Sequence, residues 1–162
     1  MTPSAPSPSG ENVVAVDGGT DADRRDLLAI HHGFLAANDP LDADMLRKVW
    51  DGDPRRAFFN TNGHTYQGLD DWLKVWDYYR VRFRLVRPYG AGNIRIVVRG
   101  DMAVIAADGV SRTKEWVGKP EETHNPKRYR TTQVCLREGG RWKVVHAHFS
   151  EQAEGPRPDQ QA

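Results

Sequence analysis

Two histidines near the C-terminal end, in the segment RWKVVHAHFS at residues 141–150, are of a type and spacing that could do chemistry. Successive side chains of a β-strand point to opposite faces, so His146 and His148 would share one face. Imidazole titrates near neutral pH, and burial favours its neutral, proton-accepting form. Trp142 and Val144 precede the pair on the same face, which predicts that both histidines point toward the interior.

Three interpretations of this histidine pair stay open. One imidazole could act as a general base that removes a proton next to a carbonyl, while Tyr66, Asn60 or Arg130 stabilises the developing oxyanion. The pair could instead be structural, with each ring hydrogen-bonded inside the fold. It could also supply two ligands to zinc or iron, with His64 or His31 as a third. No strand acid at metal-ligand spacing accompanies the pair, so a metal is not expected.

Aromatic residues elsewhere in the chain could form the walls of a pocket around such a base. Trp50, Trp72 and Trp76 are the candidate wall residues, and His31 and Asp108 are candidate further contacts to a ligand. Aromatic walls around a few polar groups suit a small, hydrophobic organic ligand. The alternative for the tryptophans is ordinary core packing.

The elements that must position these residues follow from apolar spacing. Leu27, Ile30, Phe34 and Ala37 recur at helical intervals after an N-cap at Thr20 or Asp21. A short helix after Asp42 and a third helix from about residue 69 to 79 are also predicted, with a hairpin between them. Strands are predicted at about 93–99, 102–116, 128–138 and 141–149. Helices first and long antiparallel hairpins last predict an α+β domain whose helices cover one face of a curved sheet.

Composition limits the class of protein. The 23 Lys and Arg residues against 22 Asp and Glu give a net charge of +1, so no nucleic-acid partner is expected. The N-terminus lacks a secretory signal and no apolar run has membrane-spanning length, so a cytoplasmic protein without a membrane partner is expected. The single cysteine, Cys135, excludes an internal disulfide. No glycine-rich phosphate loop or dinucleotide fingerprint is present, so no cofactor is expected.

Two tails rich in Pro, Ser and Gly are expected to be disordered, at residues 1–19 and 151–162, and they bracket one domain at 20–150. Trp142 and Val144 make one face of the last strand apolar. Near the end of the strand, Ala147 and Phe149 make the opposite face apolar as well. That pattern predicts that the outer face of the sheet packs against a second copy of the chain.

The segments FFNTNGHTYQGLDDWLKVW and TTQVCLREGGRWKVVHAHFS resemble the nuclear transport factor 2-like superfamily, in particular its SnoaL-like branch. The second segment is also similar to the end of the association domain of calcium/calmodulin-dependent protein kinase. The resemblance covers residues 22–150. It implies a conical barrel made of a strongly curved antiparallel sheet and three N-terminal helices, which enclose a pocket. It also implies a homodimer formed sheet to sheet.

The superfamily holds isomerases, dehydratases, cyclases and non-catalytic modules, so the fold alone does not give the function. The expected function is cofactor-independent proton transfer on a hydrophobic carbonyl or hydroxy compound. The alternative is a non-catalytic homodimerisation or ligand-binding module. The carboxylate base of the isomerases has no clear counterpart here, and Asp108 is the nearest acid. The arginine of the kinase domain's ligand pocket falls near Gly109, which leaves Arg112, Arg128 or Arg130 as substitutes.

Overall fold

A computed structural model describes residues 12–118 and 124–161 of the chain, and it has the α+β fold predicted from the sequence. In these two ranges the helices are α1 (Asp21–Asn38), α2 (Ala43–Arg47) and α3 (Leu69–Arg80), and the strands are β1 (Asn12–Asp17), β2 (Ala57–Phe59), β3 (Thr65–Gln67), β4 (Phe83–Gly90), β5 (Asn93–Arg99), β6 (Met102–Trp116), β7 (His124–Glu138) and β8 (Arg141–Glu151). None of the described helices is long and apolar enough to cross a membrane.

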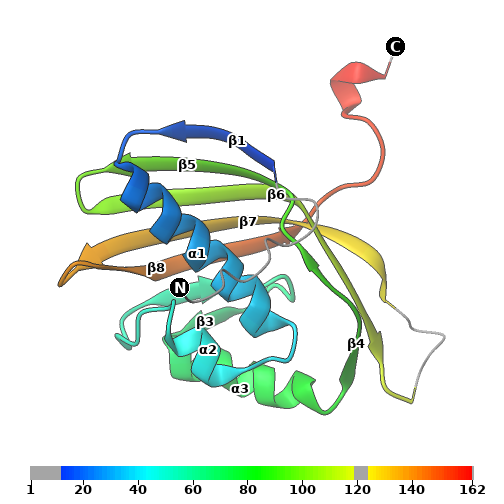
Figure 1. The fold of residues 1–162 in the computed structure, drawn as a ribbon. Helices are drawn as coiled ribbons and strands as arrows, with labels where there is room; N and C mark the ends of the chain where they lie inside the picture. Colours follow the sequence, from blue (N-terminus) through cyan, green and yellow to red (C-terminus); the bar gives the residue numbers. More distant parts are fainter. Residues whose placement is uncertain (1–11, 119–123, 162) are drawn as a thin grey trace, which may run out of the picture.

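The strands form one curved sheet in the order β1-β5-β6-β7-β8-β2-β3, and β4 pairs with the far half of β6. Strands β5 to β8 are an antiparallel meander, whereas β1 and β2 join it in parallel. Figure 1 shows α1 lying across one face of the meander, with α2 and α3 below it and β4 curling away beside the end of β6. Helices, β4 and the curled sheet together enclose a hollow.

Helix α1 is fixed to the sheet at its first turn. Thr20 is the N-cap, and its side chain and that of Asp23 form a capping box. The Asp23 carboxylate also accepts hydrogen bonds from Arg137 at 2.6 Å and from the Trp142 indole at 3.2 Å. One acidic side chain thus caps the helix and joins it to β7 and β8, which sets where the rest of α1 crosses the sheet.

A bulge in β6 changes which of its residues face the hollow. Between Ala107 and Val110, β6 has one residue more than β7 opposite to it, and Gly109 adopts a φ of 66° there. The odd-numbered residues up to Ala107 are buried under the helices. Beyond the bulge the even-numbered residues Val110, Arg112 and Lys114 face inward instead.

A second bulge, at Val145, does the same in β8. The pairing with β7 skips Val145, so one residue is added to β8 at this point. Trp142 and Val144 are buried before the bulge, and Ala147 and Phe149 are buried after it. The sequence predicted a strand that is apolar on both faces, but these four apolar residues all point to the interior.

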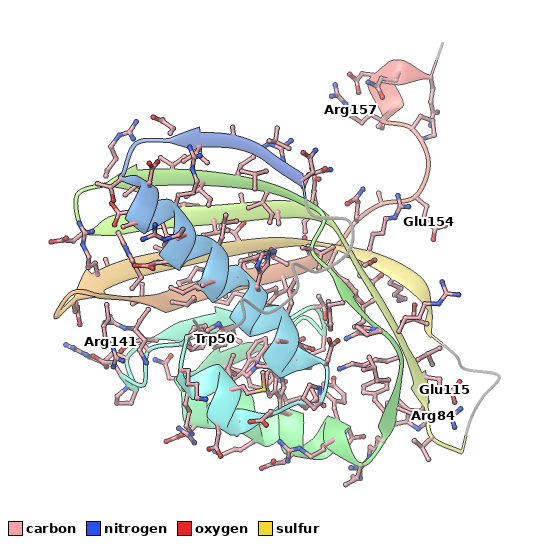
Figure 2. All side chains as sticks on the ribbon, in the orientation of Figure 1. Trp50, Arg84, Glu115, Arg141, Glu154 and Arg157 are labelled. Atoms are coloured by element: carbon pink, nitrogen blue, oxygen red, sulfur yellow. The ribbon has the colours of Figure 1, made fainter. Side chains whose placement is uncertain are left out.

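The structure extends the ordered part of the chain beyond the predicted domain at its N-terminal side. Asn12–Asp17, predicted as tail, forms β1 on the edge of the sheet beside β5, while residues 1–11 and 162 lie outside the described ranges. At the other end, Glu151 closes β8 and the chain then leaves the body of the fold, as the positions of Glu154 and Arg157 in Figure 2 show. Strand β4 was not predicted either.

Candidate functional site

A cavity of about 200 Å³ lies between the end of α1, α3, β4 and the inward faces of β6, β7 and β8. Its volume is below the range of about 300–1,000 Å³ typical of drug-sized ligands, so it fits a small molecule. The lining residues are Phe34, Asn38, Leu41, Asn60, Thr61, Asn62, Trp72, Trp76, Tyr79, Phe83, Tyr89, Val110, Arg112, Lys114, Tyr129, Thr131, Phe149 and Glu151.

Two cations, Arg112 and Lys114, project into this cavity from the inward face of β6. The Arg112 guanidinium donates to the Tyr89 hydroxyl at 3.4 Å and lies 5.0 Å from the centre of the Tyr129 ring. The Lys114 ammonium group donates to the backbone oxygen of Asn38 at 2.7 Å, and its side chain is only 2% exposed. Lys114 is buried and Arg112 is partly buried, and placing two like charges away from water is costly, so this end of the cavity is a candidate site.

The end of α1 holds Lys114 in place. Asn38 is the last residue of the helix, and the last carbonyls of a helix have no partner within it. Lys114 satisfies one of these carbonyls, at the negative end of the helix dipole. The next residue, Asp39, accepts a hydrogen bond from the Tyr89 backbone N–H at 2.9 Å, which ties β4 to the same helix end.

The surroundings of Lys114 shift its protonation. Burial, and after it the neighbouring Arg112 charge, lower the pKa of Lys114 from 10.5 to about 7, while the Asp39 charge opposes the change. Burial raises the pKa of Tyr89 and of Tyr129, so both phenols stay protonated. The cavity therefore presents a permanent cation next to an amine that is partly neutral at physiological pH.

Aromatic rings make up much of the remaining wall. Trp72 lies 5.7 Å from Phe149 between ring centres, and Phe149 lies 4.9 Å from Phe34. Thr61 and Asn62 are exposed lining residues, so this polar end of the cavity meets solvent. A ligand with an anionic group and an apolar body matches this division into a cationic and an aromatic part.

Three of the residues predicted from the sequence line the cavity, namely Asn60, Trp72 and Trp76. Trp50 is fully buried one layer behind the wall, stacked on Phe34 at 5.5 Å, and Figure 2 shows it under the sheet in the interior. Tyr66 is outside the lining set: its ring packs edge-on against Trp72, and its hydroxyl accepts from Asn62 at 2.8 Å. Trp50 and Tyr66 are therefore supporting positions outside the cavity lining.

His31 was predicted to contact a ligand, but it belongs to the packed core. The residue is fully buried on α1 and is absent from the cavity lining. Burial lowers the pKa of His31 to about 4, so its ring is neutral over the physiological range. Its contribution is to packing under the sheet.

The predicted inward direction of the histidine pair is wrong. Because the bulge at Val145 reverses the alternation, His146 and His148 lie on the outer face of the sheet, opposite to the lining residue Phe149. The His146 Nδ1 atom is 2.6 Å from the Ala57 backbone oxygen, and His148 is exposed. Both imidazoles meet the ring of Phe59 edge to face, with centres 4.9 and 5.4 Å away.

The other strand residues predicted for the site also lie outside the cavity. Arg130 is exposed on the outer face of β7, and so is Arg128. Asp108 lies at the β6 bulge, where its carboxylate accepts from Asn93 at 2.8 Å. Of the three arginines considered as substitutes for the kinase-domain arginine, Arg112 alone lines the cavity. Within the described residues, no group of three His, Cys, Asp or Glu side chains could hold a metal ion.

Sequence reasoning missed Lys114 and the tyrosines Tyr79, Tyr89 and Tyr129 as site residues. Alternation along β6 without a bulge places Lys114 on the solvent face, where a lysine is unremarkable. The Asp108-Gly109 pair inside an otherwise strand-like segment was the available signal, because an isolated glycine in a strand often marks a bulge.

Comparisons with known proteins place the chain in a family. The model of the SnoaL-like domain matches residues 27–154, whereas no curated protein matches the chain. Solved structures with the same fold include a nuclear transport factor 2-like protein from Salmonella enterica, with a TM-score of 0.68 at 18% identity over 87% of this chain and 99% of that one. A ketosteroid isomerase-like protein from Erwinia carotovora gives 0.68 at 14% identity, over 83% of this chain and 100% of that one.

A third structure, a candidate calcium/calmodulin-dependent kinase II association domain from Exiguobacterium sibiricum, gives a TM-score of 0.65 at 11% identity, over 85% of this chain and 99% of that one. Identities this low show the shared fold alone. The family model, in contrast, spans most of the chain and includes every strand that carries the cavity. The chain therefore belongs to the SnoaL-like domain family of the nuclear transport factor 2-like superfamily.

Proposed function

We propose that the protein binds a small organic acid that carries a carbonyl group, and that it moves a proton at the carbon next to that carbonyl. Isomerisation, dehydration and cyclisation all use this step, and none of them needs a cofactor. The observation that carries the proposal is the pair of cations, Arg112 and Lys114, inside an otherwise aromatic cavity.

Each cation has a role that its chemistry allows. Arg112 is charged at all relevant pH values and can bind a carboxylate or a developing enolate through two parallel N–H groups. Lys114, with a pKa of about 7, can accept a proton near neutral pH. The rings of Trp72, Trp76 and Phe149 would hold the apolar body of the ligand.

The test uses phenylpyruvate, a keto acid with an aromatic body, and phenylacetone, its counterpart without the carboxylate. We expect Arg112→Gln to weaken phenylpyruvate binding about ten- to hundredfold, since a hydrogen bond to a charged partner contributes about 1.5–3 kcal/mol. Arg141→Gln is the matched control, because Arg141 is exposed at the far turn between β7 and β8 (Figure 2). Titration calorimetry gives both affinities. Equal binding of the two ligands by the unmodified protein would contradict the proposal.

A non-catalytic ligand-binding module is the second candidate, favoured by the likeness to the candidate kinase association domain. Hydrogen–deuterium exchange at the carbon next to the phenylpyruvate carbonyl, followed by proton NMR, separates the two candidates. Protein-dependent exchange supports proton transfer. Binding without any acceleration of exchange supports the module.

We also propose that the outer face of the sheet packs against a second copy of the chain. Val97, Val104, Val134 and His146 are register neighbours across β5 to β8 and form a row of three valines and one imidazole on that face. Phe59, 38% exposed, lies beside this row. A mainly apolar row of this kind across four strands suits a sheet-to-sheet contact.

The double variant His146→Ala/His148→Ala tests this arrangement. We expect it to keep the hydrogen exchange of phenylpyruvate within about twofold of the unmodified protein, as surface changes away from a site usually do. We expect it to raise the dissociation constant of the dimer, measured by sedimentation velocity over a dilution series. Hydrogen exchange of phenylpyruvate slowed by tenfold or more would show that the histidines take part in proton transfer.

A further inference from the structure

The amine of Lys114 has few partners for a group so deeply buried. Its two hydrogen-bond acceptors both belong to Asn38: the backbone oxygen at 2.7 Å and the side-chain oxygen at 3.5 Å. Among residues 12–118 and 124–161, no carboxylate forms an ion pair with it. Lys114 also lines a second hollow, with Asp39, Arg80 and Leu85. Apart from these two acceptors, the ammonium group lies 5.7 Å from the centre of the Tyr89 ring of β4.

Three conditions favour a lysine as a nucleophile: removal from water, a nearby second cation, and space for a carbonyl compound. Lys114 is 2% exposed, Arg112 is two residues away on the same inward face of β6, and both line the aromatic cavity. We propose that Lys114 forms a covalent imine with the carbonyl carbon of the ligand. The imine rests on the function proposed above and specifies how that site activates its substrate.

The chemistry of the step is balanced without an added reagent. The lone pair of the neutral amine attacks the carbonyl carbon, and the carbonyl electron pair moves to oxygen, which gives a carbinolamine. A carbon–nitrogen double bond then forms as the carbon–oxygen bond breaks. Both hydrogens of the amine leave with that oxygen as one molecule of water. The imine nitrogen then takes up one proton from water. The protonated imine withdraws electrons more strongly than the ketone, so the neighbouring C–H becomes more acidic and can give its proton to water while Lys114 is bound to the ligand.

The position of Arg112 suits a ligand that carries both an acid and a carbonyl. Alternate residues of a strand have Cα atoms roughly 7 Å apart, and two long side chains can close that span onto one small molecule. Arg112 binding the carboxylate would leave the carbonyl carbon facing Lys114. An ordinary lysine is less than about one part in a thousand neutral at pH 7, whereas a pKa of about 7 leaves about half of Lys114 as the free amine.

Reductive trapping tests the imine directly. The full chain is incubated at neutral pH with phenylpyruvate, and in parallel with levulinate, in the presence of sodium cyanoborohydride, and the product is digested for peptide mass mapping. We expect a single reduced adduct at Lys114. Lys143 is the matched internal reference, because its ammonium group also donates to a backbone oxygen at a helix end, that of Arg47 at 2.9 Å, but outside the cavity.

Two variants accompany the trapping. Lys143→Met should still give the Lys114 adduct, and Lys114→Arg, which keeps the charge and the fold, should lose it. Adducts spread evenly over exposed lysines would overturn the imine. Hydrogen exchange by the unmodified protein without an adduct at Lys114 would overturn it too, while leaving proton transfer by a general base in place. Neither binding, exchange nor an adduct with either keto acid would overturn the imine and the proposed function together.

Discussion

Replacing Lys114 with Met is expected to slow the protein-catalysed hydrogen exchange of phenylpyruvate by roughly 10²–10⁴-fold, the usual contribution of a positioned base. Methionine keeps the length and most of the volume of the side chain but cannot accept a proton. The unmodified protein should exchange faster as the pH rises through about 7, because Lys114 then loses its proton. The variant should show no such rise. Lys143→Met, which removes a lysine outside the cavity, should behave like the unmodified protein.

The same variant has an expected effect on stability that depends on pH. Burial lowers the pKa of Lys114 in the folded state, so the unfolded chain binds the proton more tightly between pH 7 and 10.5. Stability of the unmodified protein therefore rises with pH over this window. Below pH 7 the folded protein carries the buried charge in full, a penalty on the order of 5 kcal/mol.

Lys114→Met removes that penalty and loses the hydrogen bond to Asn38, which offsets about 1 kcal/mol. We therefore expect the variant to be the more stable protein at about pH 6 and its advantage to shrink as the pH rises toward 10.5, because the lysine becomes neutral in both states only above that pH. Urea unfolding at several pH values measures this difference. A variant less stable than the unmodified protein at about pH 6 would show that the buried charge is well compensated.

Apolar spacing in the sequence was enough to predict most of the fold. The stripe of Leu27, Ile30, Phe34 and Ala37 predicted α1, and Thr20 is its N-cap as expected. The strands from β5 to β8 were also predicted with nearly correct limits. Strand β4 was missed because its side chains are mostly exposed and show no clear alternation. β1, an edge strand with only one neighbour, has the same exposed character.

The site was harder to predict, because one added residue reverses every later side chain in a strand. In β8 the added residue is Val145, and no glycine or proline marks it. The apolar residues Ala147 and Phe149 were the only trace of the reversal, and they were interpreted as an outer interface. Their burial in the core means that an outer interface must be argued from other residues, such as Val134.

The bulge in β6 had the larger consequence for function. Counting alternately from Ala103 and Ile105 places residues 109, 111 and 113 inside, and Lys114 outside. The bulge around Gly109 brings Lys114 inward instead. A deletion that removed the extra residue of β6 would therefore turn both Lys114, the proposed base, and Arg112 out of the cavity. Their positions depend on the same single residue of β6.

Replacing Trp50 with Ala is expected to destabilise the fold by about 3–5 kcal/mol, the usual loss for a buried aromatic side chain. Trp50 is fully buried. Its ring stacks on Phe58 with centres 4.3 Å apart and meets Trp72 at 5.0 Å. Its backbone is bridged to β8 at Val144, so the side chain cannot move far to fill a gap. The total stability of a domain of this size is about 5–15 kcal/mol, so much of it would be lost.

We also expect Trp50→Ala to weaken ligand binding, because Trp50 packs behind the residues of the cavity wall. Its neighbours Trp72 and Phe149 both line the cavity, and without Trp50 they lose a packed surface. We expect Trp50→Phe to lose less stability and to retain phenylpyruvate binding. Trp116→Ala, at a half-buried position near the tip of β6, is the matched control with a smaller expected loss. Urea unfolding monitored by far-ultraviolet circular dichroism compares the three. Equal losses for Trp50→Ala and Trp116→Ala would mean that this aromatic cluster is not the centre of the core.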